Sequence, residues 1–149
     1  MTDRLPRIAY LLGAAGLLPQ AAAVGWLMTG SLDWQTTAAV AAFAYPALIL
    51  SFLGGTWWGL AAAAGEQAPA GTWVIAVTPS LIALFTVGLG FWASWPWPML
   101  VLGIALLVSP AIDVLLVRRG LAPPGWASLR LPLSLGLGAL TIAAAAITG

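Results

Sequence analysis

The sequence contains no cysteine and no histidine, and charged residues make up only 6% of its 149 residues. Without cysteine there are no disulfides and no thiol chemistry, and without histidine there is no imidazole for base catalysis or haem ligation. The net charge of +1 gives no basic surface of the kind that nucleic-acid-binding proteins use. An ordinary soluble domain has about a quarter of its residues charged. The composition therefore excludes a soluble domain and several classes of catalytic site.

Apolar residues take the place of the missing charges and make up 62% of the chain. A run of about 20 apolar residues is long enough to cross the hydrocarbon core of a bilayer. Five such runs are separated by short connections, and we expect spans at about residues 8–28, 36–64, 72–92, 99–117 and 131–147. The sequence thus predicts an all-α membrane protein. Its fold would be a five-transmembrane-helix bundle, formed by a single membrane domain over residues 1–149.

The arginines predict how this bundle is oriented. Arg4 and Arg7 precede the first span, whereas Arg118, Arg119 and Arg130 lie in or beside the connection between the fourth and fifth spans. With five spans these two regions lie on the same side, and basic residues are retained on the cytoplasmic side. We therefore expect a cytoplasmic N-terminus and an outside C-terminus in a multi-pass protein of the bacterial inner (cytoplasmic) membrane. We expect the first span to be retained, not cleaved as a signal peptide.

Four prolines stand near the middle of four spans, and each has a polar neighbour. The four sites are Pro19-Gln20, Tyr45-Pro46, Thr78-Pro79-Ser80 and Ser109-Pro110. Proline removes one helical hydrogen bond and clashes with the preceding turn, and hydrocarbon offers no water to replace that bond. We therefore expect proline-kinked helices around a tight or cavity-bearing interior. Gln20 and Tyr45 are the main candidates at this depth, either for interhelical hydrogen bonds or for the lining of a pocket.

The densest local pattern is the segment Ser51–Gly59, of sequence SFLGGTWWG, near the cytoplasmic end of the second span. This span is longer than a bilayer requires, so the helix either tilts or bends at Gly54-Gly55. Two interpretations of the segment remain open. Gly55 and Gly59 form a small-xxx-small pair, so this segment, with Gly54 beside the pair, would be a close-packing seam with Trp57 and Trp58 as interface anchors. Alternatively, the tryptophans would form the aromatic wall of a pocket for an apolar or planar ligand, with Ser51 beside it.

Asp113 is the only acid within an apolar span, about one turn inside the cytoplasmic end of the fourth span. Carboxylates inside a membrane are costly and indicate function by default. Asp113 would either pair with Arg130 and close the fourth span onto the fifth, or handle protons or bind a lipid headgroup. The connection Gly120–Arg130 carries Trp126 and is either a stiff connector or a cytoplasmic lid. The scattered single acids do not predict a metal site, and we expect no metal and no cofactor.

Two local signals predict where the fifth span begins. Ser128 is a suitable N-terminal cap for a helix. Pro132 would then fall in the first turn of that helix, where its missing N–H costs little. We therefore expect Pro132 to differ from the four prolines near the middle of the other spans.

Several segments resemble a known family. They are LLGAAGLLP at residues 11–19, ILSFLGG at residues 49–55 continuing to Trp58-Gly59, and Asp113 followed by Pro124, Trp126, Leu129 and Arg130. Together they resemble the bacterial and mitochondrial family called domain of unknown function 3429, which includes transmembrane protein 69. The resemblance covers nearly the whole chain and implies a small multi-helix membrane protein, but no activity. Members of this family often carry a histidine where this chain has Trp57.

The near absence of catalytic residue types favours a non-enzymatic integral membrane protein that binds a hydrophobic partner. This partner would be a lipid, a quinone, a pigment or the helices of a larger membrane complex, in which the protein would be an accessory or assembly subunit. Membrane lipids are therefore expected partners, and nucleic acid is not. A small oligomeric transporter or channel that uses Asp113 is the alternative. A membrane enzyme that acts on lipid headgroups through Ser51, Asp113 and Arg130 is the third hypothesis.

Overall fold

The computed structural model describes residues 5–149, and every regular element within them is helical. The elements are α1 (Arg7–Ala15), α2 (Leu18–Thr29), α3 (Leu32–Ala64), the short 3-10 helix η1 (Gly65–Gln67), α4 (Ala70–Gly90), α5 (Pro96–Arg118) and α6 (Trp126–Thr148). Five stretches are long and apolar enough to cross a membrane: α1 with α2 as one stretch, and each of α3 to α6. The expected all-helical, multi-pass fold with five spans is confirmed at this level.

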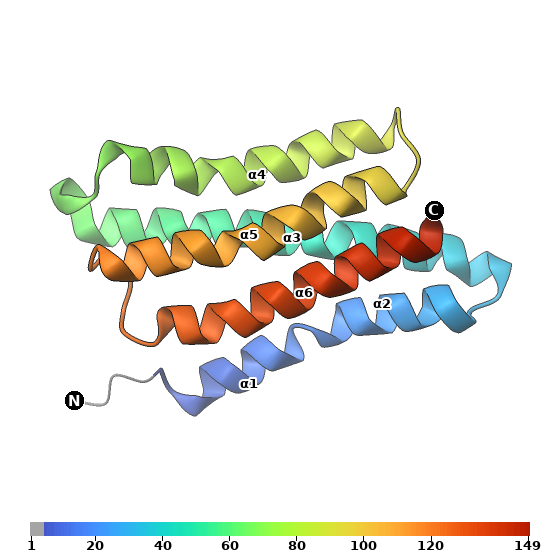
Figure 1. Cartoon of the computed structure of the whole chain (residues 1–149), viewed down its shortest axis with the longest axis horizontal. Helices are drawn as coiled ribbons and strands as arrows, with labels where there is room; N and C mark the ends of the chain where they lie inside the picture. The colour runs from blue at the N-terminus through green and yellow to red at the C-terminus, as the bar shows by residue number, and fades with distance from the viewer. Residues whose placement is uncertain (1–4) are drawn as a thin grey trace.

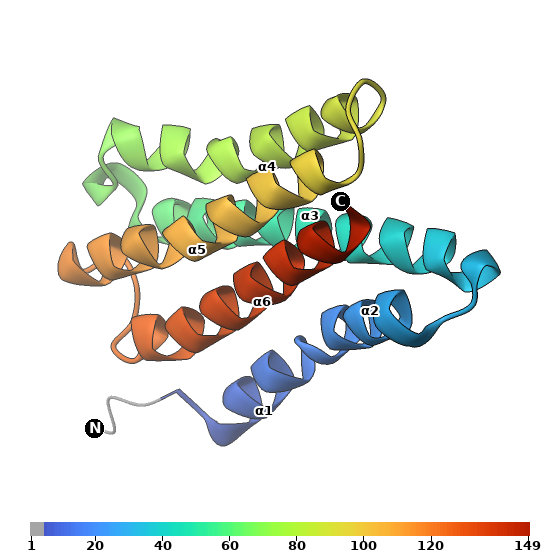
Figure 2. The same ribbon diagram turned by 45° about the vertical axis from the view of Figure 1, so that its right-hand side comes forward.

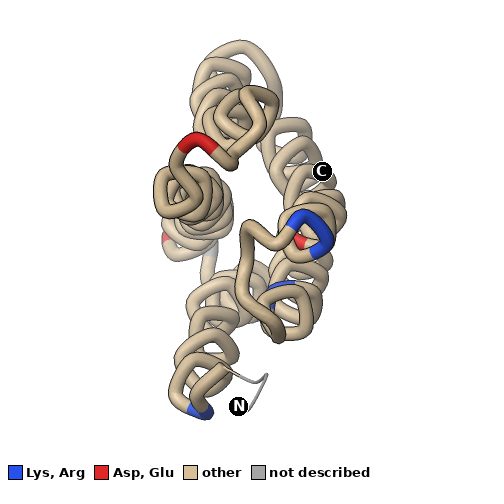
Figure 3. The backbone as a smooth tube through the Cα atoms, turned by 90° about the vertical axis from the view of Figure 1, so that its left-hand side faces the viewer, with Lys and Arg blue, Asp and Glu red and all other residues tan. Residues whose placement is uncertain are grey.

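The helices run side by side along the long axis of the molecule, and consecutive spans alternate in direction (Figure 1). The most extensive pairings are α5 with α6 and α3 with α4, while α2 packs against α3 and α6 (Figure 2). Figure 3 looks onto the end of the bundle where α1, α4 and α6 begin and α3 and α5 end. The described arginines belong to helix ends and connections at this end, whereas Arg4 lies outside the described residues.

The first span is interrupted in its middle. Helix α1 ends at Ala15, and α2 begins at Leu18 with a proline in its first turn. A proline in a first turn costs little because that N–H has no helical acceptor. The other three prolines, Pro46, Pro79 and Pro110, lie inside helices that continue through them. Helix α3 is also continuous through Gly54-Gly55 and, at 33 residues, is about 50 Å long.

The start of the last span differs from the expectation. Helix α6 begins at Trp126, not near residue 131, and Pro132 lies in its interior. Ser128 does not cap the helix, because the cap position belongs to Gly125, whose φ of 84° is left-handed and suits glycine. Ser128 instead donates a hydrogen bond to the carbonyl of Gly125 at 2.7 Å. Because the chain turns at Gly125, α6 begins before Arg130 and includes this residue.

The distribution of side chains is that of a lipid-facing bundle. The buried polar residues of the described chain are Gln20, Thr72, Thr86, Ser109, Asp113, Ser134 and Thr141. Large apolar side chains such as Leu84, Phe85 and Phe91 are exposed on the outside. Soluble proteins place most such side chains inside, whereas membrane bundles pack small residues at helix contacts and use polar side chains to join helices. The polar interior is where the candidate site lies.

Candidate functional site

The first span and α3 each donate a side-chain hydrogen bond to a backbone carbonyl of the other. Pro46 has no N–H, so the carbonyl of Ala42, four residues earlier, lacks its helical donor. Gln20 is fully buried and donates a hydrogen bond from Nε2 to that carbonyl at 3.1 Å. Tyr45, beside Pro46, donates its hydroxyl to the carbonyl of Gly16, where the first span is interrupted. Gln20 and Tyr45 therefore both form interhelical hydrogen bonds, which was one of the two expected roles.

The proline of α5 has a local repair. Pro110 leaves the carbonyl of Leu106 without its helical donor, and Ser109 Oγ donates to this carbonyl at 2.8 Å. Ser109 Oγ also lies 3.2 Å from Ser134 Oγ on α6. The Ser109 hydroxyl thus supplies a donor to the Leu106 carbonyl and also contacts α6.

A close seam joins α3 to α4. Ser51 Oγ lies 3.0 Å from Ser80 Oγ, the polar neighbour of the proline in α4. A Cβ atom on Gly54 would lie 2.5 Å from the carbonyl oxygen of Ala76, which is too close for any side chain. A Cβ on Gly55 or on Gly59 would have no neighbour within 4 Å among the described residues, so the close approach expected at this pair is wrong. Ser51 and Gly54 therefore belong to a packing seam, and Gly55 lies outside it.

The two adjacent tryptophans of α3 point in different directions. Trp57 is 3% exposed and faces the interior, whereas Trp58 is 47% exposed. Trp58 forms an edge-to-face contact with Trp73 of α4, with a centroid separation of 4.8 Å. Only Trp57 reaches the polar interior.

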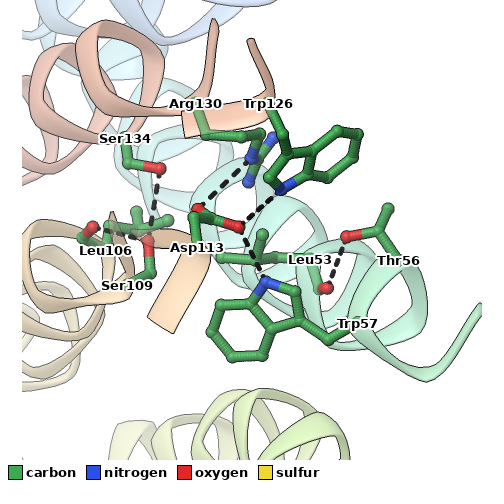
Figure 4. A network of polar contacts seen from close by, with 9 residues as sticks. All are labelled: Leu53, Thr56, Trp57, Leu106, Ser109, Asp113, Trp126, Arg130 and Ser134. Atoms are coloured by element: carbon green, nitrogen blue, oxygen red, sulfur yellow. Dashed lines mark hydrogen bonds and ion pairs between the residues drawn. The ribbon is translucent and has the colours of Figure 1, made fainter. Parts of the chain in front are cut away.

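Asp113 is the centre of a polar cluster that joins three helices (Figure 4). The side chain is fully buried on α5, and its Oδ1 accepts hydrogen bonds from Trp57 Nε1 of α3 and Trp126 Nε1 of α6, both at 2.9 Å. The other oxygen, Oδ2, lies 3.7 Å from Arg130 Nε of α6. The expected pairing of Asp113 with Arg130 is present. We call these four residues the Asp113 cluster.

The two indoles bind one oxygen of the Asp113 carboxylate, and the guanidinium lies beside the other oxygen. Hydrogen bonds to a charged acceptor are stronger than bonds between neutral groups, and they offset part of the desolvation cost of a buried ion. The separation of 3.7 Å is too long for a hydrogen bond. Within residues 5–149 neither Asp113 Oδ2 nor Arg130 Nε has a hydrogen-bond partner. The two indoles therefore fix the position of the Asp113 carboxylate, and Arg130 Nε remains a donor without a hydrogen-bond partner within residues 5–149.

A groove of about 280 Å³ begins at Arg130 and lies between the first span, α3, α5 and α6. Most of its lining is apolar, for example Ile49 of α3, and its polar side chains are Arg130, Ser134 and Tyr45. On α6 it extends from Arg130 to Leu137, which corresponds to about 10 Å of helix. The groove thus extends from Arg130 of the Asp113 cluster to Tyr45 and Gly16, where the first span is interrupted.

A second cavity of about 210 Å³ lies among α3, α4 and α5. Trp57, Pro79 and Ser109 contribute to its lining, which is otherwise almost wholly aliphatic. Trp57 therefore contacts this cavity with part of its ring while its N–H reaches Asp113. The second cavity therefore has few polar groups that could orient a ligand.

The structure brings together four of the candidate residues that the sequence indicated: Trp57, Asp113, Trp126 and Arg130. Ser134 was not among the candidates, although it lies one helical turn after Arg130 and shares its face. That spacing was the available signal. Within residues 5–149 no group of three or more acids, cysteines or histidines could hold a metal ion.

This fold and this cluster define a small multi-span helical membrane protein with a buried carboxylate shared by two indoles and a guanidinium. The model of the family described as "Protein of unknown function (DUF3429)" matches residues 5–146, and the chain belongs to this family. The match confirms the resemblance noted in the sequence. No curated protein matches the chain, and no solved structure matches it.

Proposed function

We propose that the protein is a non-enzymatic integral membrane protein that binds one hydrophobic molecule from the bilayer in the groove beside the Asp113 cluster. The observation that carries this proposal is the groove itself, with about 280 Å³ of space and a largely apolar lining. Ligand pockets in proteins are mostly apolar and carry a few polar groups that orient the ligand. Arg130, Ser134 and Tyr45 supply such groups at this site.

The proposed orientation places the Asp113 cluster toward the cytoplasmic side of a bacterial inner (cytoplasmic) membrane. Four described arginines, Arg7, Arg118, Arg119 and Arg130, lie at helix ends or connections at one end of the bundle. The positive-inside rule supports a cytoplasmic position for that end. The N-terminus is then cytoplasmic and the C-terminus outside. In this arrangement the prolines kink their helices in the layer where the groove ends.

The contacts of Asp113 favour this proposal over a transporter or channel. A carboxylate in an ion path must exchange its partners for the ion, but Asp113 is fully buried and joins three helices through two short hydrogen bonds. The contacts of Ser51 weigh against a headgroup enzyme in the same way. Its hydroxyl contacts Ser80 on α4 and so joins helices.

Native mass spectrometry of the protein purified in mild detergent tests the proposal. We expect one bound hydrophobic molecule per chain. Ile49→Trp adds volume to the groove wall and should remove this extra mass. Leu48→Trp is the matched control, because the neighbouring Leu48 is 68% exposed and does not line the groove. Wild-type protein without bound mass would contradict the proposal, and so would equal loss in both variants. Recovery of a second membrane protein without a small molecule would favour an accessory subunit.

A further inference from the structure

The groove contains one charged residue, and that charge is already balanced. Of the described residues that line the groove, only Arg130 is charged, and Asp113 lies behind it at 3.7 Å. We propose that the polar end of the ligand is a neutral hydrogen-bond acceptor, a carbonyl oxygen, bound by the guanidinium of Arg130. This inference rests on the proposed function and names the chemical class of the ligand.

Asp113 stays in place beside Arg130. Its Oδ1 is fixed at 2.9 Å by Trp57 from one side and by Trp126 from the other. These two indoles come from α3 and α6, so the carboxylate is held by the fold and does not depend on Arg130 for its position. A ligand that approaches Arg130 therefore meets a guanidinium whose positive charge is already matched by a negative one.

Arg130 still needs an acceptor. A guanidinium has five N–H donors and no acceptor, and the Arg130 side chain is only 12% exposed. Its buried Nε lies 3.7 Å from Asp113 Oδ2 and has no hydrogen-bond partner within residues 5–149. The terminal N–H groups are the donors that a ligand in the groove could reach, and the groove wall beside Arg130 is mostly aliphatic. A ligand that brings an acceptor oxygen to this end of the groove would give these donors a partner.

The charges at the site favour a neutral acceptor over an anionic one. An anionic head would share the site with the carboxylate of Asp113, and the site would then carry two negative charges against one positive charge. Such an excess is unfavourable where the surroundings are apolar. The other described arginines, Arg7, Arg118 and Arg119, are exposed and do not line the groove. A carbonyl oxygen accepts from Arg130 without adding charge.

The lining of the groove also constrains the rest of the ligand. Beyond Arg130 the groove continues for about 10 Å along α6 between Leu133 and Ile49. Phe52 lines it and is also exposed on the outside of the bundle, so the groove is open toward the lipid. The ligand therefore has a carbonyl head and an apolar body that enters from the bilayer. Acyl esters and quinones share this chemistry.

Three probes of equal chain length compare a neutral carbonyl head, an anionic head and no polar head. They are a long-chain fatty acid methyl ester, the corresponding fatty acid at a pH where it is ionised, and the alkane. Binding is measured by native mass spectrometry on wild-type protein. Because a hydrogen bond to a charged group is worth about a factor of ten or more, we expect the ester to bind about tenfold more tightly than the alkane. The ionised acid should bind more weakly than the ester. A decyl benzoquinone as a fourth probe distinguishes a quinone from an acyl ester, and either one, if it binds more tightly than the alkane, supports a carbonyl head.

Substitution of Arg130 tests whether this residue makes the distinction. Arg130→Gln replaces the charged donor with a neutral amide, which forms a weaker hydrogen bond, and should therefore reduce the preference for the ester over the alkane. Arg119→Gln, at an exposed arginine, is the control and should keep the preference for the ester. If Arg130→Gln does not fold, the ranking of probes on wild-type protein still decides. Equal binding of all three probes, or tightest binding of the ionised acid, would overturn the carbonyl inference alone, whereas no binding of any probe would overturn the proposed function.

Discussion

Gln20 on α2 donates a hydrogen bond to the carbonyl of Ala42 on α3, and this carbonyl is the one that Pro46 leaves without a helical donor. Lipid surroundings cannot replace the missing donor, so the break in α3 becomes a specific attachment point for α2. Tyr45 of α3 in turn donates a hydrogen bond to the carbonyl of Gly16, where the first span is interrupted. The two proline sites thus fix the first span against α3, and the groove ends between these contacts.

The repair of Pro46 predicts a coupling between two substitutions. Gln20→Leu should lower the free energy of unfolding by about 1–3 kcal/mol, because a buried carbonyl loses its partner. In a Pro46→Ala background the restored N–H at residue 46 serves the Ala42 carbonyl, so Gln20→Leu should cost much less. A double-mutant cycle measured by unfolding in mixed micelles checks this. Equal costs of Gln20→Leu in both backgrounds would contradict the assignment.

The indole donors of the Asp113 cluster predict a second coupling. Trp57→Phe removes one hydrogen bond to a buried carboxylate and should destabilise the protein by about 1.5–3 kcal/mol. With Asp113→Asn the acceptor is neutral, and the same substitution should cost less. Trp92→Phe is the control, because Trp92 is 92% exposed. The role of Trp57 as a charge-stabilising donor is wrong if its replacement costs the same with aspartate and asparagine at position 113.

The seam between α3 and α4 predicts opposite outcomes for adjacent glycines. Gly54→Ala would place a Cβ atom 2.5 Å from the backbone oxygen of Ala76, so the two helices must move apart. Overpacking of this kind costs about 1–3 kcal/mol. Gly55→Ala meets no neighbour within 4 Å and gains helix propensity, so its stability should stay equal or rise slightly. Thermal unfolding of the two variants checks this, and equal effects would contradict the described seam.

The apolar runs were sufficient to predict five spans, and the position of Asp113 and Arg130 near the connection between the last two spans made their pairing one of the two expected roles of Asp113. The bonds from Trp57 and Trp126 were not predictable in the same way. Adjacent residues on a helix point about 100° apart, so the sequence alone could not say whether Trp57 or Trp58 faces Asp113. That choice depends on how α3 is rotated against α5, and Gly54 sets part of this rotation by its close approach to α4.

The start of α6 shows a second reason why local signals were insufficient. Arg130 lowers the hydropathy of the segment and suggested a span that begins after it. In the folded protein Asp113 lies beside Arg130 and balances its charge, so the helix can include this residue. The balance comes from another helix and is invisible in the local sequence. The donor at the interruption of the first span likewise comes from another helix, because Tyr45 of α3 donates its hydroxyl to the carbonyl of Gly16.

Isoleucine methyl groups report directly on whether the groove is the binding site. Ile49 lines the groove, whereas Ile75, Ile82 and Ile112 line the second cavity. The measurement is an NMR titration of isoleucine δ1-methyl signals with a long-chain methyl ester, on protein in lipid nanodiscs. We predict a saturable shift of the Ile49 signal, which in Arg130→Gln requires a higher ester concentration, with the second-cavity signals unchanged. Saturable shifts confined to the second cavity, or no saturable shift at Ile49, would contradict the account.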